Sequence, residues 1–117
     1  PYATGGIRMA YDEGLAHLMR DDLHDEPGIT EKKMFGGLCF LLNGNMVCGV
    51  HKDGGMFRVG KPREAEALAI EGAREMDFTG RRMGGFIDVD SDLMGDDTRR
   101  GQMMALALAN ARALPPK

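Results

Sequence analysis

The sequence predicts an α+β domain, with a five-stranded, largely antiparallel sheet and helices packed on it in the order α-β-β-β-α-β-β-α. Three observations lead to this prediction. Apolar residues recur at helical spacing near both ends of the chain, an Asn-Gly pair separates two apolar runs, and glycine-rich turns divide successive strand-like segments. Runs of neighbouring strands flanked by helices are typical of α+β domains, whereas a parallel doubly wound sheet alternates strand and helix.

The length and composition fit one small domain. The chain has 117 residues, of which 43% are hydrophobic and 28% charged, and its formal net charge is -3. No apolar run approaches the roughly 18 residues that a membrane helix needs, so we expect no membrane contact. Residues 1–8 lack the pattern of a secretory signal and are predicted to be a tag or other non-native leader. Residues 9–117 are then a single domain, with the cytoplasm as its expected location.

The first helix is expected from Tyr11 to Leu23. Leucines and a methionine recur there on one face, from Leu15 to Met19, and charged residues fill the other face. The helix should end near His24, because Pro27-Gly28 cannot continue it.

A β-hairpin is expected around Asn43-Gly44. Both residues tolerate the positive φ that a type I′ turn requires, and apolar runs at 38–42 and 46–50 flank them. A two-residue turn predicts these pairs: Phe40 with Val47, Leu41 with Met46, and Cys39 with Cys48. A three-residue turn ending at Asn45 would shift this register.

This register leaves both faces of the hairpin apolar. Helices can cover one face, so the other needs a further element, a second copy of the chain or a different protein. The sequence therefore predicts a homodimer or a partner interface. Its candidate residues are Cys39, Leu41, Met46 and Cys48.

Further elements follow in the second half of the chain. The expected ones are a strand at 56–59 after the turn at Asp53-Gly54-Gly55, a helix from Pro62 to about Gly72, strands at 75–78 and 86–89, and a last helix from Asp96 or Asp97 to the residues before Pro115-Pro116. Most of the ten methionines are assigned to the core.

No catalytic, cofactor or metal site is predicted. The two cysteines would meet across the hairpin at a distance that permits a disulfide, but a reducing cytoplasm favours two free thiols. The acidic run at 88–92 imitates the start of a calcium loop, yet Leu93 and Arg99 replace the glycine and glutamate that such a loop needs. We therefore expect the chain not to be an enzyme.

A nucleic-acid-binding module is the alternative hypothesis. The net charge disfavours it, because phosphate binding needs a concentrated positive face. The residues that would serve are Lys32, Lys33, Arg58, Lys61, Arg63, Arg81 and Arg82. Contact with DNA should then weaken steeply as salt rises.

Several segments resemble one known family. The segments are Met34–Phe40 with the following 43–46 turn, 56–59, 81–89 and the terminal helix out to Lys117. Together they resemble the TfoX (Sxy) N-terminal domain family. The resemblance implies a fold akin to secretion-chaperone-like and YjbR-like domains, and it brings no catalytic residues.

The same resemblance implies a regulatory role. The family includes a regulator of natural competence that promotes transcription together with a cyclic-AMP receptor protein. We therefore expect a non-catalytic regulatory or adaptor domain with a transcription-regulatory protein as partner. This chain lacks the C-terminal helical domain of two-domain members, and it also lacks the tryptophan often found in the final helix. The first difference favours action alone or with a separate chain over a competence role.

Overall fold

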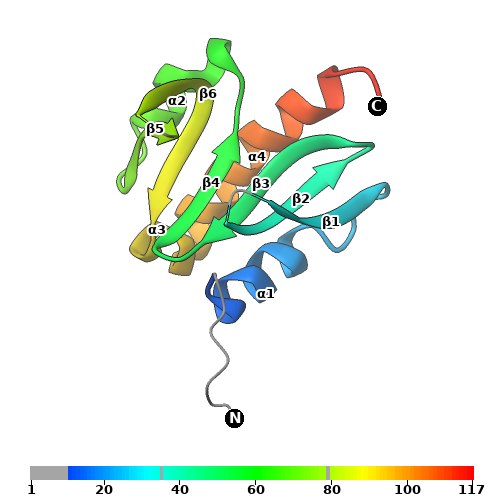
Figure 1. Cartoon of the computed structure of the whole chain (residues 1–117), viewed down its shortest axis with the longest axis horizontal. Helices are drawn as coiled ribbons and strands as arrows, with labels where there is room; N and C mark the ends of the chain where they lie inside the picture. Colours follow the sequence, from blue (N-terminus) through cyan, green and yellow to red (C-terminus); the bar gives the residue numbers. More distant parts are fainter. Residues whose placement is uncertain (1–10, 35, 79) are drawn as a thin grey trace.

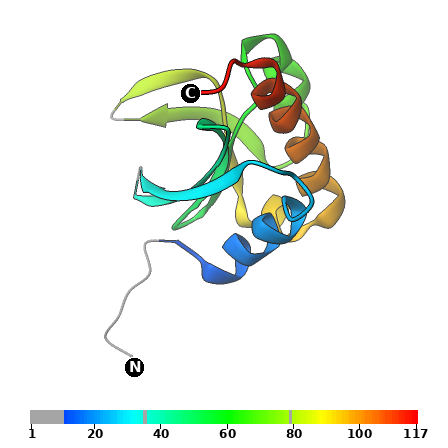
Figure 2. The ribbon, with the colours of Figure 1, turned by 90° about the vertical axis from the view of Figure 1, so that its right-hand side faces the viewer.

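The computed structural model describes residues 11–34, 36–78 and 80–117, and the predicted leader lies outside this part of the chain. Antiparallel strands form one six-stranded sheet in the order β1-β2-β3-β4-β6-β5, and the helices pack on one of its faces (Figures 1 and 2). The strands are β1 (Ile29–Met34), β2 (Gly37–Leu42), β3 (Asn45–His51), β4 (Gly54–Arg58), β5 (Ala73–Phe78) and β6 (Arg81–Asp90). The helical elements are α1 (Glu13–Asp22), the 3₁₀ turn η1 (Lys61–Arg63), α2 (Glu64–Leu68), α3 (Ser91–Gly95) and α4 (Asp97–Ala113). The α+β class is confirmed, with one strand more than predicted.

The additional strand is β1, at an edge of the sheet. It pairs only with β2, and its four central residues are exposed. An edge strand of this kind lacks the apolar alternation by which strands are recognised, and its lysines discourage pairing with another chain. For that reason β1 was not among the predicted strands.

The first helix lies where it was expected. Asp12 caps α1 by accepting a hydrogen bond from the Leu15 backbone N–H at 3.2 Å, and the helix is capped at its end by Leu23. Ala16 and Met19 of α1 are fully buried in the main core, between the helices and the sheet. The predicted amphipathic pattern is therefore confirmed.

The hairpin between β2 and β3 has the predicted turn but not the predicted register throughout. Asn43 and Gly44 both have positive φ, at 51° and 86°. Leu41 pairs with Met46 as expected. Farther from the turn, the register shifts at a β-bulge between Phe40 and Leu41. Phe40 therefore pairs with Cys48 instead of Val47. A turn dictates pairing only near itself, and one extra residue shifts everything beyond it.

The main core lies between the sheet and the helices. Its large members include Phe40, Phe57 and Ile87 from the strands, and Met103 and Met104 from α4. The expected last helix is confirmed, whereas the middle helix is shorter than predicted. A short helix, α3, was not predicted. No helix in the described residues is long and apolar enough to cross a membrane.

Candidate partner-binding face of the sheet

The sheet face opposite the helices carries a second apolar cluster, which we call the methionine face. Its buried members are Cys39, Met46, Met56 and Met76, and its partly buried members are Met34, Leu41, Met83 and Phe86. All of these described residues belong to strands, so within the described part of the chain no helix contributes to the cluster. Figure 2 shows the helices on one side of the sheet, with the β1–β2 and β5–β6 hairpins projecting on the other.

A glycine lets the centre of this face pack tightly. Gly49 pairs with Cys39 on one side and with Met56 on the other. A Cβ at Gly49 would lie 3.0 Å from Cys39 Sγ and 3.1 Å from the Met56 Cε methyl. Both side chains therefore occupy the space above the glycine, which explains why Cys39 is 0% and Met56 1% exposed.

The outer part of the face is more accessible. Met34, Leu41, Met83 and Phe86 are only partly buried, and they come from three strands, β1, β2 and β6. Contiguous apolar side chains on a sheet surface are a feature that binding surfaces of proteins share. Methionine suits such a surface, because its unbranched thioether adapts to differently shaped partners.

Three of the four residues predicted for a partner interface lie on the methionine face. Cys39, Leu41 and Met46 are members of the methionine face. Cys48 is not, and its prediction was wrong. The bulge turns both Val47 and Cys48 toward the helices.

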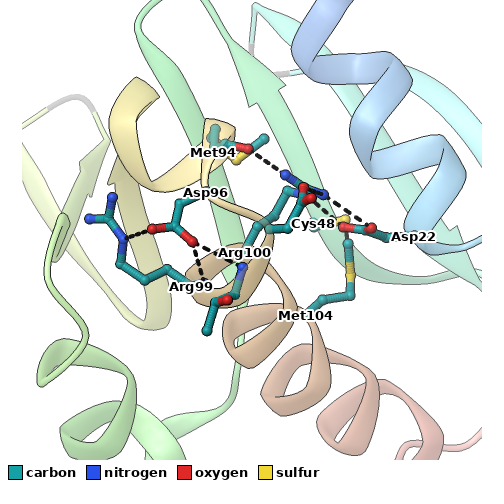
Figure 3. A network of polar contacts seen from close by, with 9 residues as sticks. Asp22, Cys48, Met94, Asp96, Arg99, Arg100 and Met104 are labelled. Carbon is teal, nitrogen blue, oxygen red and sulfur yellow. Dashed lines mark hydrogen bonds and ion pairs between the residues drawn. The ribbon is translucent and has the colours of Figure 1, made fainter.

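On the helix side, Cys48 lies against α4. Its Sγ is 3.9 Å from Met104 Sδ, and Figure 3 shows the two side chains together. Cys39 and Cys48 are free cysteines on opposite faces of the sheet. The pairing that would have permitted a disulfide does not occur.

Neither thiol is prepared for nucleophilic chemistry. Burial raises the pKa of Cys39 to about 11. Burial also raises the pKa of Cys48, and the nearby Cys39 and Asp22 contribute in the same direction. Since the thiolate is the reactive form, both side chains behave as apolar groups at neutral pH.

Five members of the face are not among the residues predicted for an interface: Met34, Met56, Met76, Met83 and Phe86. Alternation offered one signal, since Met56 precedes the core residue Phe57 in the same strand and must face the other way. Their common location depends on the strand order, which no local pattern contains.

A polar cluster borders the methionine face. His51 Nε2 lies 2.6 Å from Asp88 Oδ1 and 3.1 Å from the Gly55 carbonyl oxygen, and Arg74 Nε donates to Asp88 Oδ2 at 2.7 Å. The Asp53 backbone N–H donates to His51 Nδ1 at 3.2 Å. Two acceptors at Nε2 and a donor at Nδ1 assign the neutral ring as its Nε2–H tautomer.

The two partners shift each other's ionisation. The hydrogen bond with Asp88 raises the pKa of His51, against the opposing effect of burial. Burial acts to raise the pKa of Asp88, but His51 and Arg74 outweigh it, and the pKa is lowered. Asp88 therefore stays ionised and engaged by two neighbours.

The three aspartates that imitate a calcium loop diverge. Asp88 binds His51 and Arg74, whereas Asp90 caps α3 by accepting from the Leu93 N–H at 2.8 Å. Asp92 lies in the first turn of α3. Within the described residues, no group of three or more His, Cys, Asp or Glu side chains is arranged to hold a metal ion.

The seven predicted nucleic-acid-binding residues divide between several places. Lys32 and Lys33 lie next to each other on β1, but the register places Lys32 on the methionine face and Lys33 on the helix side. Arg58 reaches over the Phe86 ring, with its Cζ 5.7 Å from the centroid. Lys61 and Arg63 belong to η1.

The remaining pair, Arg81 and Arg82, begins β6. Arg82 faces the helix side and binds Glu64 at 2.7 Å and Glu75 at 3.2 Å. Carboxylates therefore offset part of the positive charge at this end of the sheet. The structure does not gather all seven residues into one basic surface.

A separate hollow of about 220 Å³ lies beside α1 and β1, on the helix side. Arg20 binds Glu31 through two hydrogen bonds of 2.7 and 3.0 Å at this hollow. The guanidinium also lies 6.0 Å from the Phe40 ring centroid. Arg20 and Glu31 satisfy each other at this hollow, and Glu26, another charged residue of its lining, accepts a hydrogen bond from Arg112.

Comparison with known proteins identifies the family. The model of the TfoX N-terminal domain matches residues 21–111, which include every strand of the sheet, the last two residues of α1 and most of α4. No curated protein and no solved structure gave a significant match. The extent of the family match decides the assignment. The chain belongs to the TfoX N-terminal domain family.

Proposed function

We propose that this chain is a non-catalytic regulatory or adaptor domain that binds another protein through its methionine face. One observation carries the proposal: the eight members of the face all come from strands, and the helices of residues 11–34, 36–78 and 80–117 pack on the other side of the sheet. A sheet with two apolar faces needs a cover on both. The regulatory role follows from what the family resemblance implies.

The chemistry of the described residues favours binding over catalysis. The two thiols are buried and neutral, and the single polar cluster at the methionine face has its carboxylate engaged by both His51 and Arg74. An acid–base catalyst needs a group whose proton is available to a substrate. Asp88 and His51 instead hold two strands and an edge arginine together.

Self-association is one form that such binding takes, and the sequence predicts a homodimer. Light scattering coupled to gel filtration tests it on purified protein over a range of concentrations. A dimer that uses the methionine face should become monomeric in Leu41→Glu. The matched control is Leu18→Glu, which places the same charge on a partly buried leucine of α1.

Binding to other proteins is tested with the same pair of variants. Wild type, Leu41→Glu and Leu18→Glu are used to purify associated proteins, and each candidate is then made separately and titrated by calorimetry. The proposal expects an affinity that Leu41→Glu lowers by at least about tenfold and Leu18→Glu leaves within about twofold. Partners that bind both variants equally would refute the assigned face.

The nucleic-acid alternative is tested by fluorescence anisotropy with a labelled DNA duplex, at low and physiological salt and with unlabelled competitor. Saturable binding that weakens steeply with salt would replace the protein-binding proposal. The proposal expects no such binding.

A further inference from the structure

The charges on the methionine face are opposite in sign to the charge of the whole chain. Strand register and side-chain contacts place four basic residues on this face: Lys32, Arg58, Arg74 and Arg81. One carboxylate, Asp88, lies among them and binds Arg74. The chain as a whole carries a net charge of -3. The fold therefore gathers basic residues on one face, although acidic and basic residues are interspersed along the sequence.

Two acidic strand residues are turned away from this face, and a third is held at a helix end. Glu31 alternates with Lys32 on β1 and binds Arg20 of α1 on the helix side. Glu75 binds Arg82 on that same side. Asp90 is occupied as the cap of α3. Around α1, residues 12–28 contain six carboxylates and one arginine.

We propose that the partner of the methionine face is an amphipathic helix whose apolar stripe is flanked by aspartates and glutamates. This inference rests on the proposed function and adds the chemistry of the partner. The apolar stripe would contact Leu41 and Met83, and the flanking carboxylates would lie near Lys32 and Arg58. Complementary charge of this kind selects partners and speeds their encounter.

A helix is the element that fits an apolar sheet face. Helices α1 and α4 already cover the opposite face, and a helix on the methionine face would complete a three-layer arrangement. Addition of a strand at the neighbouring edge is disfavoured, because β1 presents Lys32 and Lys33 in its centre. Amphipathic helices commonly bind in methionine-rich surfaces through residues at i, i+3, i+4 and i+7.

Two other occupants fit the charges less well. A second copy placed face to face would set one basic face against another, and like charges oppose such contact. A nucleic acid would set phosphates against thioethers, and base stacking requires free aromatic faces. Phe86, the aromatic member of the cluster, is already covered by Arg58.

The test is a selection of phage-displayed random peptides of about 16 residues, roughly four helical turns, on the full chain. Enriched peptides are then synthesised with a fluorescent label and titrated by anisotropy. We expect sequences with Leu, Ile, Met or Phe at helical spacing beside Asp or Glu. Leu41→Glu should abolish their binding, and Leu18→Glu should not.

The decisive comparison is between adjacent lysines. Lys32→Glu and Lys33→Glu change the net charge equally on the same exposed strand, but only Lys32 faces the methionine cluster. We expect Lys32→Glu to weaken peptide binding about three- to tenfold and Lys33→Glu by less than about twofold. Raising the salt concentration should reduce this difference. Circular dichroism melts of each variant serve as the control for folding.

Failure of this inference is distinguishable from failure of the proposed function. Peptides that depend on Leu41 but are neutral or basic, or that bind Lys32→Glu and Lys33→Glu equally, overturn the acidic partner and keep the face as a binding site. A selection that yields no Leu41-dependent peptide counts against both. Displacement by duplex DNA with a steep salt dependence, or a dimer dispersed by Leu41→Glu, assigns the face to a nucleic acid or a second copy.

Discussion

Arg100 of α4 and Asp22 at the end of α1 form an ion pair across 78 residues of sequence, with Nε 2.6 Å from Oδ2 and Nη2 3.3 Å from Oδ1 (Figure 3). The arginine also donates to the Met94 carbonyl oxygen at 2.8 Å and to Asp97 at 2.8 Å. Its side chain is 5% exposed, against 25% for Asp22 and 88% for Asp97. One buried guanidinium therefore joins α1, α3 and α4.

Removal of this arginine should destabilise the protein strongly. Arg100→Ala leaves the Met94 carbonyl and the partly buried Asp22 without their donor, and we expect a loss of about 2–4 kcal/mol in the free energy of unfolding. Asp97→Ala removes an exposed partner and should change it by less than about 0.5 kcal/mol. Urea denaturation measures both. Equal effects of the two substitutions would contradict the assigned role of Arg100.

Two glycines should respond in opposite directions to replacement by alanine. A Cβ at Gly49 would lie 3.0 Å from Cys39 Sγ and from the Leu38 carbonyl oxygen, so we expect Gly49→Ala to cost about 1–3 kcal/mol. Gly101 lies within α4 and has nothing within 4 Å of its Cβ position, so Gly101→Ala should stabilise by about 0.5–1 kcal/mol. Thermal or urea unfolding of the two variants checks the pair. A stabilised Gly49→Ala would show that the methionine face is loosely packed.

The cysteines should be slow to react and should not join. Cys39 and Cys48 are both 0% exposed, and burial raises the pKa of Cys39 to about 11. We expect thiol reagents to label neither residue of the folded protein at neutral pH, and both to be labelled in denaturant. After mild oxidation, the intact mass should not show the loss of two hydrogens that disulfide formation causes. An intramolecular disulfide in folded protein would require a different register of β2 and β3.

The pKa of His51 should depend on its hydrogen bond with Asp88. The pKa of His51 is raised in the folded protein, so this ionisation contributes stability that is complete below the unfolded value of about 6.5 and is lost as pH rises through the folded value. Asp88 has a lowered pKa, so its contribution is present above about 3.8 and lost as pH falls through the folded value. Protonation also removes the acceptor that His51 Nδ1 offers to the Asp53 N–H, which then turns to water.

NMR titration of the His51 ring tests this coupling. We expect a pKa above that of an unstructured histidine in the wild type, and a decrease toward it in Asp88→Asn. The difference in unfolding free energy between wild type and His51→Gln should shrink as pH rises from about 6 through the folded pKa. A His51 that titrates identically in both proteins would contradict the ion pair.

Local patterns predicted the elements whose causes are local. The Asn43-Gly44 turn, the amphipathic α1 and the final helix are each specified by residues within a few positions of one another, and all are present. β1 escaped prediction, because an exposed edge strand has no apolar face to show in the sequence. α3 escaped as well, because five residues following a strand and capped by Asp90 carry no periodic signal.

The sequence by itself determined the fold class, the family and the existence of a second apolar face. Only the tertiary structure decided which residues form that face. The bulge beside Val47 moved Cys48 to the helix side, and the order β1-β2-β3-β4-β6-β5 brought Met34 and Met83 into one cluster. The same pairing collected Lys32, Arg58, Arg74 and Arg81 on one side of an acidic chain. The physical reason is that alternation along a strand is local, whereas register and neighbour order are set by packing between distant segments.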